Sequence, residues 1–157
     1  MRILVISDSH GNGNVIENIL NKHSEVREVF FLGDVTKDIE DLPYIYTDKI
    51  FHIVSGNCDF FSQYPYTDIA VTGGKKIMFT HGHTYGVKGG IGALKSAAKQ
   101  NGCDIVLYGH THIPYTEYDD GLYIVNPGSV SRGRDSKCTY AAVDIENNGI
   151  LPIIIEI

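Results

Sequence analysis

The segment MRILVISDSH, residues 1–10, sets the pattern that decides the fold. Its aliphatic run from Ile3 to Ile6 ends in a short polar block that contains Asp8 and His10. An uninterrupted apolar run of this length is typical of a strand buried on both faces. We therefore predict a buried strand that delivers a carboxylate and an imidazole at its carboxyl end, where open α/β sheets bind ligands.

The same pattern recurs four more times along the chain. Apolar runs at 29–32, 50–54, 77–80 and 105–108 precede the polar blocks Gly33-Asp34, Gly56-Asn57, His81-Gly82-His83 and Gly109-His110-Thr111-His112. Taken singly, each block has an ordinary structural explanation, such as a helix cap for Asp8, a turn for Asp34 or Asn57, and a loop for the histidines. Their joint order at successive strand ends favours a metal centre instead.

The ligand types define the chemistry of such a centre. Imidazole, carboxylate and amide oxygen suit Mn, Zn, Fe, Co or Ni, and the lack of cysteine among the candidates disfavours a purely structural zinc site. The candidate ligands are Asp8, His10, Asp34, Asn57, His81, His110 and His112. This set exceeds what one tetrahedral ion needs and suits two ions roughly 3.5–4 Å apart, which can act on a phosphate ester.

The order Asp-x-His, Gly-Asp, Gly-Asn-x-Asp, His and Gly-His-x-His resembles the calcineurin-like metallophosphoesterase superfamily, and the chain length resembles its short YfcE-type phosphodiesterases. The resemblance covers nearly the whole chain, as far as Asn126-Pro127-Gly128-Ser129 and the strand beyond. It implies an α/β fold of two packed mixed β-sheets flanked by helices. By the same resemblance, the first metal would be held by Asp8, His10 and His112, and the second by Asn57, His81 and His110, with Asp34 bridging them.

The resemblance also implies a reaction, the hydrolysis of a phosphodiester by a hydroxide that bridges two divalent metals. Mn is the expected metal, with Ni, Co, Zn or Fe as alternatives. Many members of the family have a histidine directly after the Gly-Asn pair, whereas this chain has Cys58. Because a thiol is a poorer proton donor than an imidazole at neutral pH, His83 is the candidate for that role, and Asp59 could orient it or a ligand.

The remaining assignments concern catalysis and substrate binding. We expect the catalytic residues to be Asp34, Asn57, His81 and His83. We expect substrate contacts from Asn57, Cys58 and Arg132, because a guanidinium can bind phosphate through paired hydrogen bonds.

Two other segments have weaker assignments. Asn126 or Ser129 could support a ligand, or could simply form a Pro-Gly turn with their neighbours. The aromatic residues after Asn57 could line a pocket for a base or aryl group, form an oligomer contact or pack in the core; they are Phe60, Phe61, Tyr64 and Tyr66.

Length and composition limit the class of protein. The 157 residues suffice for one sizeable core but not for two ordinary domains, so we expect a single domain over residues 1–157. No run is long enough to span a membrane, and no signal-peptide pattern follows Met1. The three cysteines show no CxxC spacing, which is typical of reduced thiols, and we expect a cytoplasmic protein.

The net charge bears on the partner. A formal charge of −6 disfavours a broad basic surface for nucleic acid, and two dications would bring it to −2 with the positive potential concentrated at the metals. This balance favours a small phosphodiester, although a dinucleotide or a strand end could still reach the site.

Alternatives remain to the phosphodiesterase prediction. The chain could be a phosphomonoesterase, a metal-binding regulator, or a non-catalytic scaffold like the retromer subunit that resembles this family. The C-terminal run from Ile150 to Ile155 could also form an edge strand that pairs with another subunit in a homo-oligomer.

Periodicity and turn residues predict the remaining elements. Helices are expected at 14–23 and 93–100, with a short helix and a connection at 36–48. Further strands are expected at 68–72, 76–80, 115–118, 122–125, 140–145 and 150–157. A hairpin turn is expected at 73–75 and another at 147–149.

Overall fold

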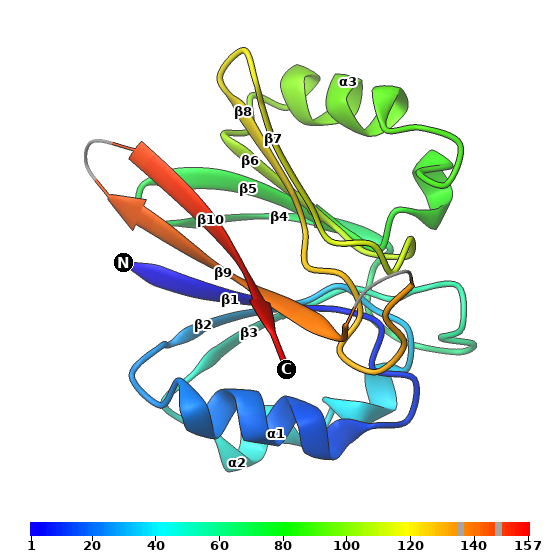
Figure 1. Ribbon diagram of the computed structural model, residues 1–157, viewed down its shortest axis with the longest axis vertical. Helices are drawn as coiled ribbons and strands as arrows, with labels where there is room; N and C mark the ends of the chain where they lie inside the picture. The colour runs from blue at the N-terminus through cyan, green and yellow to red at the C-terminus, as the bar shows by residue number, and fades with distance from the viewer. Residues whose placement is uncertain (135–136, 147–148) are drawn as a thin grey trace.

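The computed structural model describes residues 1–134, 137–146 and 149–157, and it arranges them as two β-sheets flanked by helices (Figure 1). The first sheet contains, in spatial order, β10 (Gly149–Glu156), β9 (Thr139–Glu146), β1 (Arg2–Ile6), β2 (Glu28–Phe31) and β3 (Ile50–Ile53). The second contains β4 (Thr67–Thr72), β5 (Lys75–Thr80), β6 (Ile105–Tyr108), β8 (Leu122–Asn126) and β7 (Tyr115–Asp119). Both sheets are mixed, which confirms the predicted fold class.

Strand β1 lies at the centre of the first sheet, and its two faces contribute to two different cores. Ile3 and Val5 pack into the cluster between the two sheets, together with Phe79 and Leu107 of the second sheet. The alternate residues of β1 pack on the other face, against apolar side chains of the helix that follows. Because both faces are buried, β1 has an unbroken apolar sequence rather than an alternating one.

Helices cover the outer face of each sheet (Figure 1). Helices α1 (Gly13–Lys22) and α2 (Leu42–Ile45) lie on the first sheet, and α3 (Gly92–Gln100) lies on the second. The predicted helices at 14–23 and 93–100 are confirmed to within one residue at each end. The region 36–48 contains a single 3-10 turn, η1 (Thr36–Asp38), followed by α2. A second 3-10 turn, η2 (His83–Tyr85), was not predicted.

The predicted hairpin between β4 and β5 has a two-residue turn rather than three. Gly73 and Gly74 both have positive φ, of 58° and 73°, and Lys75 already pairs with Thr72. Such a turn matches the twist of the flanking strands. The turn predicted at 147–149 falls mainly on residues outside the described ranges.

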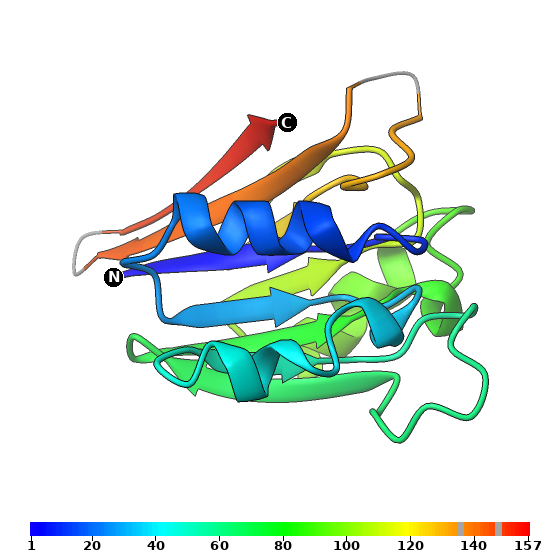
Figure 2. The same cartoon turned by 90° about the horizontal axis from the view of Figure 1, so that it is seen from below.

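The strand directions bring the candidate ligands together. Strands β1, β2 and β3 are parallel to one another, and so are β5, β6 and β8. Figure 2 shows strands of both sheets running toward the same side of the molecule, where the loops after their carboxyl ends gather. All five predicted ligand blocks lie in these loops.

Strand β10 forms one edge of the first sheet, which agrees with the edge strand suggested for the C-terminal run. Its Pro152 pairs with Val143 of β9, and proline is tolerated in a sheet mainly on such edge strands. Across the described residues, no helix is long and apolar enough to cross a membrane.

A buried lysine joins the end of α1 to the start of β3. The Lys49 Nζ donates hydrogen bonds to the carbonyl oxygens of His23, Ser24 and Val26, at 3.4, 3.0 and 2.6 Å. Its side chain is buried, and so are its contacts with the carbonyls of His23 and Val26.

We predict that Lys49→Met lowers the free energy of unfolding by about 2–4 kcal/mol, because it leaves buried carbonyls without a donor. Urea denaturation would measure the change. Lys22→Met, at an exposed position in the last turn of α1, is the matched control and should change the stability little. Equal effects of the two variants would contradict a structural role for Lys49.

Candidate metal centre

All seven predicted ligands lie on loops that follow strands of the two sheets. Asp8 and His10 follow β1, Asp34 follows β2 and Asn57 follows β3. The second sheet supplies His81 after β5, and His110 and His112 after β6.

These side chains form two groups that share one carboxylate. The first group is Asp8, His10, Asp34 and His112, and the second is Asp34, His81 and His110; within each group the potential ligand atoms lie within 4.8 Å of one another. Asn57 adjoins the second group, since its Oδ1 lies 3.2 Å from His81 Nε2.

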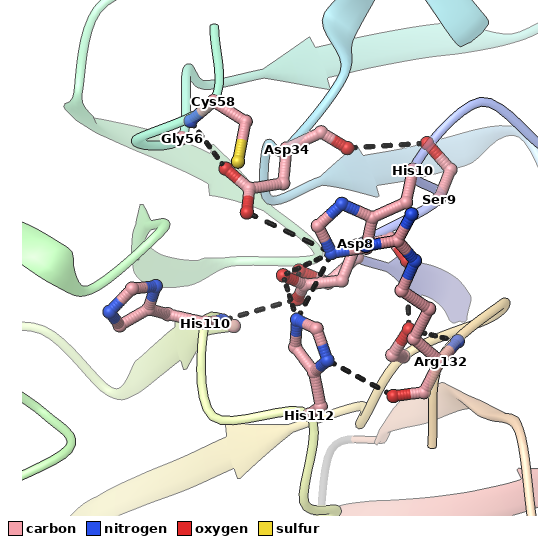
Figure 3. A network of polar contacts seen from close by, with 12 residues as sticks. Asp8, Ser9, His10, Asp34, Gly56, Cys58, His110, His112 and Arg132 are labelled. Atoms are coloured by element: carbon pink, nitrogen blue, oxygen red, sulfur yellow. Dashed lines mark hydrogen bonds and ion pairs between the residues drawn. The ribbon is translucent and has the colours of Figure 1, made fainter. Parts of the chain in front are cut away.

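The Asp34 carboxylate has one oxygen directed to each group. Its Oδ1 lies 3.4 Å from His81 Nε2, and its Oδ2 lies 3.9 Å from His10 Nε2. Figure 3 shows this carboxylate between Cys58 and His10.

Two of the histidines have their ring orientation set by backbone carbonyls. His81 Nδ1 lies 2.8 Å from the Leu32 carbonyl oxygen, and His112 Nδ1 lies 3.0 Å from that of Arg132. Because only a protonated nitrogen can donate to a carbonyl, the Nε2 atom of each neutral ring presents its lone pair to the centre. This second hydrogen bond is the usual arrangement for metal-binding histidines.

The resulting cluster of acceptors fits a cation. His10 Nε2 lies 3.1 Å from His112 Nε2, and His81 Nε2 lies 3.0 Å from His110 Nδ1. Asp8 Oδ1 is fully buried and has no hydrogen-bond partner among the described residues, although His112 Nε2 lies 3.1 Å away. Lone pairs held this close would repel one another, and a bound metal ion would satisfy them together. The residues therefore fit the metal that their sequence order implies.

The backbone at the centre is strained. Five of the candidate ligands have positive φ: Asp8 (58°), His10 (47°), Asp34 (63°), His110 (68°) and His112 (61°). This region of conformational space is sparsely populated by residues other than glycine, and such outliers concentrate at functional sites.

Two glycines allow the loops to approach this closely. A Cβ at Gly56 would lie 2.1 Å from Asp34 Oδ1, and a Cβ at Gly109 would lie 2.1 Å from Ser7 Oγ. No side chain can be accommodated at either position, because the polar atoms that it would meet support the candidate ligands.

Asp59 holds the loop of Asp34 in place. Its carboxylate accepts hydrogen bonds from the backbone N–H groups of Asp34 (2.9 Å), Val35 (2.9 Å), Thr36 (2.6 Å) and Gly56 (2.7 Å). The sequence suggested that Asp59 orients a ligand or His83. Its contacts agree with the first of these roles, because Asp59 binds backbone amides of the Asp34 loop and so positions Asp34 through the main chain.

Three serines support Asp8 in a similar way. Ser7 Oγ donates to Asp8 Oδ2 at 2.5 Å, while Ser129 and Ser131 donate to the Asp8 carbonyl oxygen at 2.8 and 3.1 Å. The suggested supporting role of Ser129 thus agrees with the contacts. Asn126 also supports a ligand loop, since its Nδ2 donates to the Gly109 carbonyl oxygen at 3.0 Å.

Sequence reasoning missed Ser7, Ser131 and Asp38. The Asp38 Oδ2 accepts hydrogen bonds from Ser9 Oγ at 2.6 Å and Gly11 N at 2.8 Å, on either side of His10. Only the position of Ser7 beside Asp8 gave a local signal. The other two act on residues far away in sequence.

The charges of the centre shift several pKa values. Burial opposes ionisation of Asp8, but the nearby His112, His81 and Ser7 outweigh it and hold the pKa of Asp8 below its usual value. Burial, aided by His81, lowers the pKa of His110 to about 4. A neutral His110 and an ionised Asp8 are the states in which these groups bind metals.

Cys58 and His83 lie beside the second group. The Cys58 backbone N–H donates to Asp34 Oδ1 at 3.0 Å, and burial together with Asp34 raises the pKa of its thiol to about 11. The His83 ring lies 5.4 Å from that of His81, centroid to centroid, and its buried Nδ1 has no hydrogen-bond partner among the described residues.

Arg132 lies on the other side, next to the first group. Figure 3 shows its side chain rising from the loop toward His10. The nearby guanidinium contributes to a lowered pKa of His10, whose main cause is burial. Of the predicted substrate contacts, Asn57 and Cys58 thus flank the second group and Arg132 flanks the first.

We predict that Asp59→Asn weakens metal binding roughly 10- to 100-fold, as is usual when the support of a ligand is lost. An amide nitrogen would face backbone N–H groups, so we also expect a loss of about 2–4 kcal/mol in stability. Calorimetric metal titration and urea denaturation would measure both. Asp68→Asn, at an exposed position on β4, is the control, and a variant at Asp59 that behaves like it would refute the positioning role.

Comparison with known proteins agrees with this geometry. Residues 1–148 match the family model of the calcineurin-like phosphoesterase superfamily domain. The chain is 32% identical over 150 residues to the probable metallophosphoesterase YsnB of Bacillus subtilis, covering 94% of this chain and 86% of that protein. It is 28% identical over 178 residues to the phosphodiesterase YfcE of Escherichia coli, covering 98% and 91%.

Similarity extends to a solved structure and to a sorting protein. A predicted phosphoesterase from Streptococcus pneumoniae superposes with a TM-score of 0.88 at 30% identity, over 99% of this chain and 88% of that one. The vacuolar protein sorting-associated protein 29 of Schizosaccharomyces pombe is 31% identical over 144 residues, covering 83% and 73%. The family match over most of the chain confirms the resemblance seen in the polar blocks, and the protein belongs to the calcineurin-like phosphoesterase superfamily.

Proposed function

We propose that this chain hydrolyses phosphodiester bonds at a centre of two divalent metal ions. The observation that carries the proposal is the position of Asp34, whose carboxylate belongs to both groups of candidate ligands. One oxygen near each group is the arrangement that a bridging carboxylate requires.

The proposed ligands follow from the two groups. The first ion would be held by Asp8, His10, Asp34 and His112, and the second by Asp34, Asn57, His81 and His110. These carboxylate, amide and imidazole groups suit Mn, and also Ni, Co, Zn or Fe. The bound metals would supply Lewis acidity and a hydroxide nucleophile at neutral pH.

The protein's own groups would position the reactants. Asp34 would set the separation of the ions, and the carbonyl-bound rings of His81 and His112 would keep their Nε2 atoms directed at them. Asn57 and Cys58 would contact the substrate on one side, and Arg132 would bind a phosphate oxygen on the other. His83, whose ring lies 5.4 Å from that of His81, would contact the leaving oxygen.

The preference for diesters rests on charge and on similarity. A phosphodiester carries a single negative charge, whereas a monoester carries up to two, and Arg132 is the one cationic side chain that we assign to the phosphate. A relative named phosphodiesterase, at 28% identity, supports the same choice.

We predict that chelator-treated protein hydrolyses bis-(p-nitrophenyl) phosphate only after Mn, Ni, Co, Zn or Mg is restored, and faster than p-nitrophenyl phosphate. Asp34→Asn should lower this activity by more than about 100-fold, since even supporting residues of metal sites contribute up to that factor. Asp68→Asn is the control. Elemental analysis should find two ions per wild-type chain.

Each other outcome has a definite meaning. Faster turnover of the monoester would retain the centre and reverse the substrate preference. Near-full activity of metal-loaded Asp34→Asn would exclude a bridging role. Folded protein that binds two ions but hydrolyses neither ester would exclude the enzyme and favour a scaffold or regulator.

We predict that Arg132→Ala lowers kcat/KM for the diester roughly 10- to 100-fold, because hydrogen bonds to charged groups contribute about 1.5–3 kcal/mol. The metal content should stay unchanged, since Arg132 binds His112 through its carbonyl oxygen alone. Arg27→Ala is the control, because Arg27 directly precedes β2 and Asp34 follows the other end of that strand. Metal loss in Arg132→Ala, or unchanged kcat/KM, would refute a direct phosphate contact.

A further inference from the structure

A recess lies beside the candidate metal centre, and none of the seven candidate ligands lines it. Its volume is about 900 Å³, within the usual range of small-molecule sites. One wall is formed by η1, α2 and the turn between them, with Lys37, Glu40, Asp41 and Tyr44; the other is formed by residues 58–64.

The recess is continuous with the candidate centre through the backbone. Val35 follows Asp34, Cys58 follows Asn57, and both Val35 and Cys58 line the recess. Since the Cys58 N–H donates to Asp34 Oδ1, Cys58 contacts the candidate centre and lines the recess at the same time.

The walls expose aromatic rings that soluble proteins usually bury. Phe60 is 82% exposed and Tyr44 is 81% exposed, and they belong to opposite walls. Phe61 is fully exposed and has a φ of 65°, a conformation that costs free energy for a bulky residue. Strain combined with exposure indicates a feature retained for binding rather than for stability.

The loop that carries the phenylalanines is anchored at its base. Ser55 Oγ lies 2.7 Å from Ser62 Oγ and 2.8 Å from the Tyr64 carbonyl oxygen, and Ser55 N donates to the Pro65 carbonyl oxygen at 2.8 Å. Across the recess, burial raises the pKa of Tyr64, and the nearby Glu40 and Tyr44 add to this effect.

The chemistry of the walls selects the type of ligand. Aromatic faces stack on bases of any sequence, and Glu40, Asp41, Ser62 and Gln63 can hydrogen-bond to the amino and carbonyl groups of a base edge. A lipid chain would leave these polar groups unpaired. The carboxylates of Glu40 and Asp41 outnumber the ammonium of Lys37, which disfavours further phosphates along a polynucleotide.

Resting on the proposed function, we infer that this recess binds the base of a single nucleoside esterified to the scissile phosphate. The natural substrate class is therefore a small nucleoside phosphodiester. Tyr44 and Phe60 stack on the base from the two walls, and the phosphate reaches the metals past Cys58.

The test compares two esters with the same leaving group, thymidine 5′-(p-nitrophenyl phosphate) and methyl p-nitrophenyl phosphate. In both, water breaks the aryl P–O bond and p-nitrophenol is released, so only the retained group differs. We expect wild-type kcat/KM to favour the nucleoside ester roughly 5- to 100-fold. Tyr44→Ala and Phe60→Ala should each lower this ratio at least about threefold, through the nucleoside ester alone.

Tyr118→Ala is the matched control, because Tyr118 is a similarly exposed aromatic residue on β7, outside the recess. It should leave the ratio unchanged. A wild-type ratio of kcat/KM values near one overturns the inference, and so does a ratio that Tyr44→Ala and Phe60→Ala do not change. In either case, hydrolysis of the methyl ester would still support the proposed function.

Calorimetry separates the two proposals if neither ester is hydrolysed. Metal-loaded wild type should bind thymidine 5′-monophosphate more tightly than methyl phosphate, and Tyr44→Ala and Phe60→Ala should abolish the difference. Equal binding of the two phosphates overturns the base site. Tighter binding of the nucleotide without turnover supports the base site and overturns the phosphodiesterase.

Discussion

The left-handed backbone of the candidate ligands is the constraint on which the rest of the site depends. Asp8 and His10 are separated by one residue, as are His110 and His112. A helix would turn the members of such a pair to different sides, and a strand would hold them about 6–7 Å apart along its length. Positive φ at both members solves this at a cost of about 1–2 kcal/mol for each residue. The surrounding structure must offset that cost before any metal binds.

The offset comes from polar groups that bind the main chain of the ligand loops. Asp59 accepts four backbone N–H groups, Ser129 and Ser131 hold the Asp8 carbonyl, and the His110 N–H donates to Asp8 Oδ2 at 3.1 Å. All of these contacts except the one from Gly56 to Asp59 join loops that lie far apart in sequence. The candidate ligands are therefore held together by the fold, and metal binding need not order them.

The sequence predicted the strands and the polar blocks at their ends well, because both are local signals. An apolar run such as Ile3 to Ile6 reports burial on both faces, and a glycine beside a polar residue reports a strand-end turn. The two-sheet arrangement followed from family resemblance, since strand order depends on pairings such as β1 with β9 that periodicity does not record. The role of Asp59 was also beyond local reasoning, because three of its four partner amides are 23–25 residues away.

One short segment joins the candidate metal centre to the proposed base site. Residues up to Asp59 belong to the frame of the centre, since Asp59 fixes the Asp34 loop and Cys58 contacts its carboxylate. Phe60 and Phe61 belong to the neighbouring recess, and Ser55 closes the loop behind them through Ser62 and Tyr64. Because the loop is anchored on both sides of its aromatic tip, a change at the tip can alter the recess without transmitting strain to the ligands. The fold thus places the proposed base site and the support of the candidate ligands in separate parts of a few consecutive residues.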